Sequence, residues 1–332
     1  MNRTLIGALA ALSLITPALA PAAAQEEPKG APSPGEIVAS AATSDWVRIA
    51  PDDLLVMTLA PDADGNTRQV VIQLMPPPFS QGWVDNIRTF ARAGWYDNIS
   101  VNRVQDNYVV QWGDPNYDNP EATGETKPLP EGLKVMGEET YVDQIVGGDE
   151  GSIVLWHPRP DISDSYSDSA SFSKGWPIGL EITEDTRTLT RWPTHCYGMV
   201  GVGRNLSPDT GSGAELYTVI GHAPRHLDRN IALVGRVIEG MEHLSSLPRG
   251  KGELGFYAAG ETDKRTPILS VRVAGDLPAA EQPGFEFLST ESETFAKYAD
   301  ARANRRDPFF ILPAGGADIC NIPVPVRRVS SE

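Results

Sequence analysis

The first half of the chain is predicted to form β-hairpins, because short apolar and β-branched runs alternate with turn residues. Residues 53–60 and 67–74 are two such runs, and the Pro, Asp, Gly and Asn residues between them predict a turn. A second pair of runs fills residues 100–114, where Asp106 and Asn107 interrupt the pattern and predict a tight turn. Side chains of one parity share a face of a sheet, so polar residues on both strands are placed to face the same way.

One helix is predicted between the two hairpins. Three prolines at 76–78 end the preceding strand, and Ser80 is placed to cap the helix that follows. Trp83, Ile87 and Phe90 lie three to four residues apart, which puts them on one stripe of an amphipathic helix.

The second half of the chain contains more strands and ends in a mixed tail. Three further β-rich runs occupy residues 214–221, 231–241 and 267–273. In the tail, Thr290 and Glu293 form a capping-box pattern that predicts a helix to about Asn304. Residues 308–313 and 319–322 are predicted as short strands.

The composition is that of a globular protein, and the charge excludes two classes of partner. The chain has 332 residues, of which 40% are hydrophobic, so it is long enough to bury a core. Its 28 Lys and Arg residues against 44 Asp and Glu residues give a net charge of −16. Nucleic acids and anionic membranes are bound by clustered positive charge, so neither is a predicted partner.

The N-terminus has the order of a secretory signal peptide. A basic residue precedes an apolar run from Leu5 to Ala20, which three further alanines follow. We expect cleavage after residue 24, a periplasmic or secreted protein, and no stable membrane insertion afterwards. The alternative is a membrane anchor, but two prolines break the run and it is shorter than the ~20 residues of a span. Residues 25–52 are predicted to be a flexible lead-in.

Cysteine usage adds a second indication of export. The chain has two cysteines, Cys196 and Cys320. In an oxidising compartment an even count predicts one disulfide, and the alternative is two separate buried thiols. A bond between them would tie the tail to the main domain across a long loop and contribute roughly 4–5 kcal/mol.

The second hairpin resembles the central hairpin of the cyclophilin-type peptidyl-prolyl cis-trans isomerases. In that family a strand ending in Phe-His-Arg turns into Phe-Met-x-Gln-Gly-Gly-Asp. The matching residues here are Arg103, Gln111, Gly113 and Asp114. The family residues are replaced at Asn102, Tyr108, Val109 and Trp112.

Further family motifs follow in the right order. Residues 84–88 are similar to the helical motif Val-x-Asn-Phe-Arg, and residues 231–241 match His-Val-Val-Phe-Gly-x-Val-x-x-Gly-Met, the most specific motif. Residues 226–228 take the place of Trp-Leu-Asp. Residues 198–205 stand where the family has Gly-x-Leu-Ser-Met-Ala-Asn, and they lack the third glycine and the β-α-β context of a dinucleotide site.

The resemblance implies a mainly β fold, a closed eight-stranded antiparallel β-barrel capped by two helices, over residues 53–275. It covers residues 53–114 and 198–275, which leaves an insertion at 115–197 and a small α/β C-terminal extension at 276–332.

The insertion is acidic and rich in Pro, Gly and Ser, so we expect a solvated loop region on the rim of the barrel. A calcium-binding loop at 161–168 is the alternative, but the central glycine and terminal glutamate of an EF-hand are missing. The tail is basic and is expected to lie against the acidic insertion.

The resemblance also assigns the site. Arg103 would stabilise the twisted transition state, with Gln111 and Tyr108 beside it; by its residues alone, Arg103 is equally a surface arginine paired with Asp106. The substrate-binding residues implied by the family pattern are Val109, Gly203, Arg204, Glu215, Tyr217, His226, Leu227 and Ile231.

The sequence therefore predicts a cofactor-free isomerase of X–Pro bonds whose partners are proline-containing segments of exported proteins. The five histidines show no metal-ligand spacing, so no metal is predicted. The alternatives are a catalytically weak proline-binding or chaperone module on the same fold, and a lipocalin-like barrel with an interior cavity.

Overall fold

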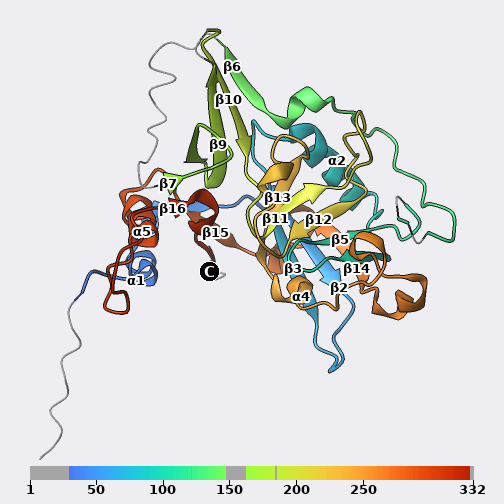
Figure 1. Cartoon of the computed structure of the whole chain (residues 1–332). Helices are drawn as coiled ribbons and strands as arrows, with labels where there is room; N and C mark the ends of the chain where they lie inside the picture. Colours follow the sequence, from blue (N-terminus) through green and yellow to red (C-terminus); the bar gives the residue numbers. More distant parts are fainter. Residues whose placement is uncertain (1–29, 118, 121, 147–161, 184, 330–332) are drawn as a thin grey trace, which may run out of the picture.

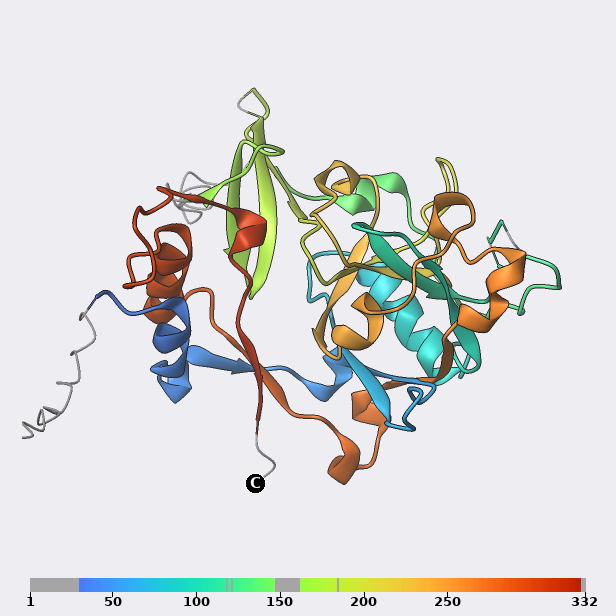
Figure 2. The ribbon, with the colours of Figure 1, turned by 60° about the horizontal axis from the view of Figure 1, so that its bottom comes forward.

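Eight antiparallel strands close into a barrel, which lies on the right in the view of Figure 2. Their order around the barrel is β11-β12-β5-β4-β14-β2-β3-β13, and β13 pairs with β11 to close it. The strands are β2 (Leu54–Leu59), β3 (Arg68–Leu74), β4 (Ile99–Val104), β5 (Val109–Gly113), β11 (Met199–Val202), β12 (Leu216–Val219), β13 (Leu233–Glu239) and β14 (Pro267–Val273). The predicted closed eight-stranded barrel is confirmed.

This structure is a computed structural model, and it describes residues 30–329 except residues 118, 121, 147–161 and 184 (Figure 1). The predicted signal peptide lies outside the described residues. Within them, no helix has the length and apolar character needed to cross a membrane.

The alternation of side chains along each strand fills the barrel. Leu55, Met57 and Leu59 of β2 point into the main core, where they meet alternate residues of β3. Helix α2 (Gln81–Arg92) packs on β13 and β14, and the short helix α4 (Glu242–Ser245) packs on β3. The predicted stripe of α2 is fully buried, although Ser80 makes no capping hydrogen bond through its side chain.

A second unit lies beside the barrel, and three separate parts of the chain build it (Figure 2). Its helices are α1 (Pro34–Ala39) and α5 (Glu293–Ala303), which pack on each other. One sheet has the order β1-β15-β17, formed by β1 (Trp46–Arg48), β15 (Phe285–Leu288) and β17 (Val326–Arg328). Another has the order β6-β10-β9-β8, formed by β6 (Asp143–Val146), β10 (Thr188–Pro193), β9 (Trp176–Thr183) and β8 (Ser169–Ser173). A small parallel pair joins β7 (Ile162–Ser163) to β16 (Ala317–Asp318).

The prediction of a flexible lead-in at 25–52 is wrong for the described part of that segment. Ser33 caps α1 and forms a capping box with Glu36, whose carboxylate accepts a hydrogen bond from the Ser33 backbone N–H at 2.7 Å. Ile37 and Trp46 are buried in the core of the second unit. Two large apolar side chains and one capping motif are thus enough to order a segment that composition alone makes loop-like.

The insertion is also more ordered than predicted. Its second half forms the four-stranded sheet, and Trp176, Ile178 and Trp192 on that sheet are buried. Of the proposed calcium ligands, Asp164 pairs with Arg225 and Asp168 accepts a hydrogen bond from the Ile182 backbone, while Asp161 lies outside the described residues. The partner of Asp164 in the structure is thus the Arg225 guanidinium and not a metal ion.

The tail lies against the insertion, but through apolar contacts, the β7–β16 strand pair and a covalent bond instead of complementary charge. Phe295 of α5 packs edge-on against Phe172 of β8 at 4.9 Å, and Cys320 is bonded to Cys196, so the predicted disulfide is present. The tail arginines for which ion pairs are seen bind acids of the tail or of β13 instead of the insertion. Neither predicted tail strand forms: residues 308–313 are a loop and residues 319–321 are a 3-10 turn.

Candidate functional site

A pocket of about 250 Å³ opens on the barrel beside the β4–β5 hairpin. It is bordered by that hairpin, by β12, and by the loops after β11 and before β13. Nine of the eleven predicted catalytic and substrate-binding residues line it: Arg103, Tyr108, Val109, Gln111, Gly203, Arg204, Tyr217, Leu227 and Ile231. The structure therefore brings together residues that the resemblance selected from four separate segments.

Arg103 is held in place at the wall of this pocket. Its Nε donates to the Leu254 carbonyl at 2.7 Å, Nη1 donates to Gln111 Oε1 at 3.1 Å, and Nη2 donates to Gln105 Oε1. The guanidinium also lies 5.6 Å from the ring centres of Tyr108 and Phe256. These contacts fix a planar cation against aromatic faces.

No carboxylate among the described residues pairs with Arg103. The alternative partner Asp106 instead binds Arg249 Nε at 3.0 Å. Burial lowers the pKa of Arg103 below its ordinary value, but an arginine remains protonated at neutral pH. The pocket therefore has a cation that forms no ion pair within the part of the chain that the structure describes.

The rest of the pocket wall is largely apolar. Val109, Tyr217 and Val219 form a small buried cluster, with Tyr108 and Ile231 packed against it. The pairing of β12 with β5 puts Tyr217 opposite Gln111. This surface suits a compact apolar ring such as that of proline.

Glu215 does not line the pocket, although it was predicted to bind substrate. It is buried behind Gln111 and accepts a hydrogen bond from Gln111 Nε2 at 3.3 Å. Gly113 makes room for it, because a Cβ at that position would lie 1.9 Å from Glu215 Oε1. Glu215 is thus placed to orient the Gln111 amide, whose oxygen also accepts a hydrogen bond from Arg103.

His226 also differs from its predicted position. It is exposed at the rim, outside the lining, and its ring stacks on Tyr108 with centroids 6.3 Å apart and planes 8° from parallel. It was predicted to bind substrate, but in the structure it contacts the lining residue Tyr108 from outside the pocket.

Four lining residues were missed by the sequence reasoning. They are Pro120, Asn205, Leu254 and Phe256. Phe256 is buried and forms an isolated β-bridge with Arg103, and the Leu254 carbonyl accepts from the same arginine. These residues lie in irregular segments without a periodic pattern, so only the three-dimensional contact identifies them.

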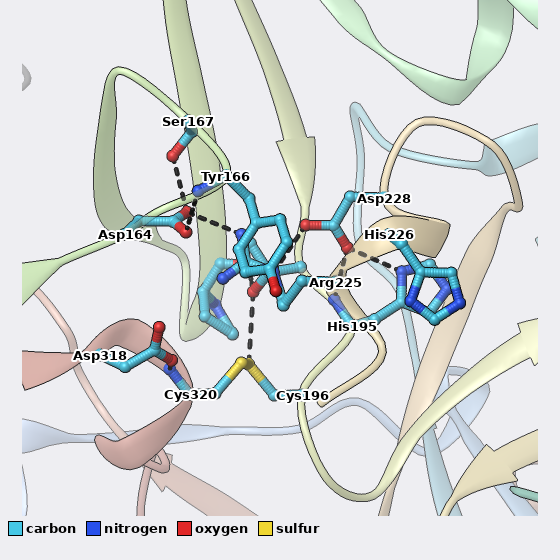
Figure 3. A network of polar contacts seen from close by, with 12 residues as sticks. Asp164, Tyr166, Ser167, His195, Cys196, Arg225, His226, Asp228, Asp318 and Cys320 are labelled. Atoms are coloured by element: carbon cyan, nitrogen blue, oxygen red, sulfur yellow. Dashed lines mark hydrogen bonds and ion pairs between the residues drawn. A yellow bond between two sulfur atoms is a disulfide. The ribbon is translucent and has the colours of Figure 1, made fainter. Parts of the chain in front are cut away.

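A buried polar chain lies behind the pocket (Figure 3). His195 is fully buried, and its Nδ1 lies 2.8 Å from Asp228 Oδ1 while its Nε2 lies 2.9 Å from the Tyr217 hydroxyl. Arg225 Nε donates to the other oxygen of Asp228 at 2.7 Å, and Arg225 Nη2 donates to Asp164 at 2.6 Å. Figure 3 shows Arg225 between the two aspartates, with the disulfide next to His195.

The surroundings of this buried polar chain determine the protonation states of its side chains. Burial lowers the pKa of His195 by more than the neighbouring Asp228 raises it, so the imidazole is neutral at neutral pH. Burial alone would raise the pKa of Asp228, but hydrogen bonds from His195 and Arg225, together with the charge of Arg225, lower it. Burial also raises the pKa of the Tyr217 hydroxyl well above its ordinary value.

Acidification is expected to destabilise the protein through His195. The unfolded chain takes up a proton near the ordinary pKa of 6.5, whereas the folded chain does so only at lower pH because of burial. Stability should therefore fall as the pH drops below 6.5, by up to about 1.4 kcal/mol per pH unit.

Urea unfolding at about pH 8 and about pH 5.5 measures this effect. His195→Leu should flatten the difference, whereas His243→Leu, which replaces a histidine outside the buried chain, should retain it. An unchanged pH dependence in His195→Leu would assign the effect to other groups.

Among the described residues, no three His, Cys, Asp or Glu side chains gather closely enough to hold a metal ion.

Comparison with known proteins agrees with this geometry. The family model described as cyclophilin type peptidyl-prolyl cis-trans isomerase/CLD matches residues 69–273. Among solved structures, cyclophilin AquaCyp293 from Hirschia baltica is similar, with a TM-score of 0.62 and 20% identity over 86% of this chain and 94% of that one. A cyclophilin type peptidyl-prolyl cis-trans isomerase of Cryptosporidium parvum, crystallised in the presence of the dipeptide Ala-Pro, has a TM-score of 0.35 and 11% identity over 66% of this chain and 98% of that one. No curated protein matches.

The barrel and its pocket define a cyclophilin-like fold, and the likeness to the Hirschia protein extends to residues outside 69–273. With the family model matching more than half of its length, the chain belongs to the cyclophilin-type peptidyl-prolyl cis-trans isomerases.

Proposed function

We propose that this protein accelerates X–Pro isomerisation in exported polypeptides, with Arg103 stabilising the twisted transition state. The observation that carries the proposal is the placement of Arg103, a cation that pairs with no carboxylate of the described residues and stands at the pocket wall with apolar side chains. Residues from four separate segments converge on that pocket.

The chemistry needs only a preference for the twisted peptide bond. Resonance sets a barrier of ~18–20 kcal/mol to rotation, and in the twisted state the prolyl nitrogen regains a lone pair. An arginine carries five N–H donors, and three are occupied by Leu254, Gln111 and Gln105 among the described residues. A remaining donor offered to the prolyl nitrogen forms a bond that is strongest at the transition state.

The pocket provides the substrate contacts that this rotation requires. Val109, Tyr217 and Leu227 offer apolar surface for the ring, and Gln111 offers an amide to the substrate backbone. Rotation breaks no covalent bond, so the proposed reaction calls for no cofactor.

Two features support exported proteins as substrates and a periplasmic or secreted location. The N-terminal residues have the order of a cleavable signal peptide. The bond between Cys196 and Cys320 is of the kind that persists in oxidising compartments.

An isomerisation assay with the peptide Ala-Ala-Pro-Phe tests the proposal. Acceleration of cis-to-trans conversion in proportion to enzyme concentration supports an isomerase. Peptide binding by calorimetry without acceleration would instead identify a proline-binding or chaperone module. That outcome would refute catalysis while keeping the pocket as the binding site.

Arg204 predicts a preference for acidic residues before proline. It lines the pocket, donates to the carbonyls of Asn230 and Asn205, and pairs with no carboxylate among the described residues. Because its charge is partly solvated, we expect peptides with Glu before Pro to exceed those with Lys by only about fivefold in kcat/KM.

Arg204→Glu should reverse this preference, and high salt should weaken it. Arg306→Glu, in the tail, changes the net charge equally and serves as the matched control. Equal rates for the Glu and Lys peptides with the wild-type protein would contradict the prediction.

A further inference from the structure

Two side chains of the insertion contact the loop at 225–231 from behind the pocket (Figure 3). Asp164 pairs with Arg225, and His195 pairs with Asp228 through both its backbone N–H, at 2.9 Å, and its ring. Arg225 and Asp228 are themselves bonded, and all four side chains are almost fully buried. The same loop supplies Leu227 and Ile231 to the pocket.

The buried polar chain formed by Asp164, Arg225, Asp228 and His195 ends at Tyr217, whose ring is part of the pocket wall. Asp228 is ionised and can only accept hydrogen bonds, so the proton of His195 is on Nδ1. The other ring nitrogen, Nε2, must then accept a hydrogen bond, and the Tyr217 hydroxyl donates it. Gly201 leaves space for this arrangement, because a Cβ there would lie 2.3 Å from the Tyr217 hydroxyl oxygen.

This bond directs the Tyr217 hydroxyl away from the substrate. His195 is buried and does not line the pocket, so the group it binds points into the protein interior. The aromatic ring remains at the pocket wall. A hydroxyl without its partner would turn to water in the pocket, and an incoming proline would have to displace that water.

We propose that His195, held by Asp228, is a positioning residue for the substrate pocket: it withdraws the Tyr217 hydroxyl so that the pocket presents an apolar ring to proline. The insertion is thereby part of the substrate site, although it lies outside the matched barrel motifs. This inference rests on the proposed function, because it concerns how the same pocket receives its substrate.

Turnover of Ala-Ala-Pro-Phe by four proteins tests the proposal: the wild type, His195→Leu, Tyr217→Phe and the double variant. We expect His195→Leu to raise KM about five- to tenfold and to change kcat less than twofold, since Arg103 is untouched. In the Tyr217→Phe background the same substitution should change KM less than twofold, because no hydroxyl is left to position.

Equal increases of KM in both backgrounds would overturn the proposal, as would a loss of kcat with KM unchanged. His195→Gln, which keeps a polar side chain at the position, covers the case in which the leucine variant does not fold. Calorimetric Kd values for the same peptide are measured in parallel. A wild type that binds the peptide without accelerating it refutes the proposed function, but the Kd cycle still decides this inference.

The pH dependence of KM gives an independent readout. Protonated His195 has no acceptor left on Nε2, so KM of the wild type should rise in acid, and this rise should be absent in Tyr217→Phe. The charged or titratable groups facing His195 are Asp228, Arg225, His226 and the Tyr217 hydroxyl. His226→Gln separates the rim histidine from the buried one. If the rise in KM in acid disappears in His226→Gln, the rim histidine causes it, and this result would contradict the proposal.

Discussion

Replacing Arg103 with alanine is expected to lower kcat/KM for proline peptides by about 10²–10³. The guanidinium is a cation at the pocket wall that pairs with no acid in the described part of the chain, and a single preorganised donor at a transition state is typically worth ~2.7–4 kcal/mol. The loss should fall mainly on kcat, because the bond to the prolyl nitrogen forms only in the twisted state. Steady-state isomerisation measured over a range of peptide concentrations separates kcat from KM.

Arg103→Lys separates charge from geometry. An ammonium keeps the charge but cannot bond Leu254, Gln111 and Gln105 with one fixed planar fork, so we expect it to recover little activity. Arg272→Ala removes another barrel arginine, one that pairs with Asp97 outside the pocket, and should retain wild-type turnover. Near-normal kcat in Arg103→Ala, with a normal melting temperature, would exclude this mechanism.

The hairpin that carries Arg103 could be predicted from the sequence because its determinants are local. Alternating β-rich residues and a turn at Asp106 and Asn107 identify its two strands, whereas the pairing of Arg103 with Gln111 follows a register shift between Val101 and Arg103 that only the structure shows. Asn107 adopts a φ of +52°, a conformation that asparagine tolerates better than most residues. The register in turn places the Arg103 guanidinium next to the Gln111 amide.

The second unit could not be predicted in the same way because its contacts join distant segments. Trp46 is a single large apolar residue in a loop-like stretch, and its strand exists only because β15, more than two hundred residues later, pairs with it. The acidic composition of the insertion likewise predicted a solvated loop region, and it gave no indication that Trp176 and Trp192 are buried.

The polar chain behind the pocket was missed for a related reason. His195 has no motif around it, and its two partners, Asp228 and Tyr217, were each assigned to separate family motifs. Tyr217 stands where the family motif Gly-Ser-Gln-Phe-Phe-Ile has a phenylalanine, and this replacement was the available signal, because a buried hydroxyl requires a partner. The sequence does not show which residue supplies that partner.

Removing the disulfide is expected to lower the free energy of unfolding by about 5 kcal/mol. Cys196 and Cys320 are 124 residues apart, and closing so long a loop restricts the unfolded chain strongly. The bond also joins two cores, because Cys196 belongs to the barrel core while Cys320 also contacts the core of the second unit. Losing it should therefore loosen the second unit first.

Denaturant unfolding of the wild type and of the double variant Cys196→Ala/Cys320→Ala measures this contribution. Dithiothreitol should shift the wild type to the midpoint of the variant and leave the variant unchanged, which separates loss of the bond from loss of the sulfur atoms. If His195 positions Tyr217, its neighbour Cys196 also matters for binding, and the double variant should show a raised KM. Equal stability of the oxidised wild type and the double variant would mean that non-covalent contacts alone hold the second unit against the barrel.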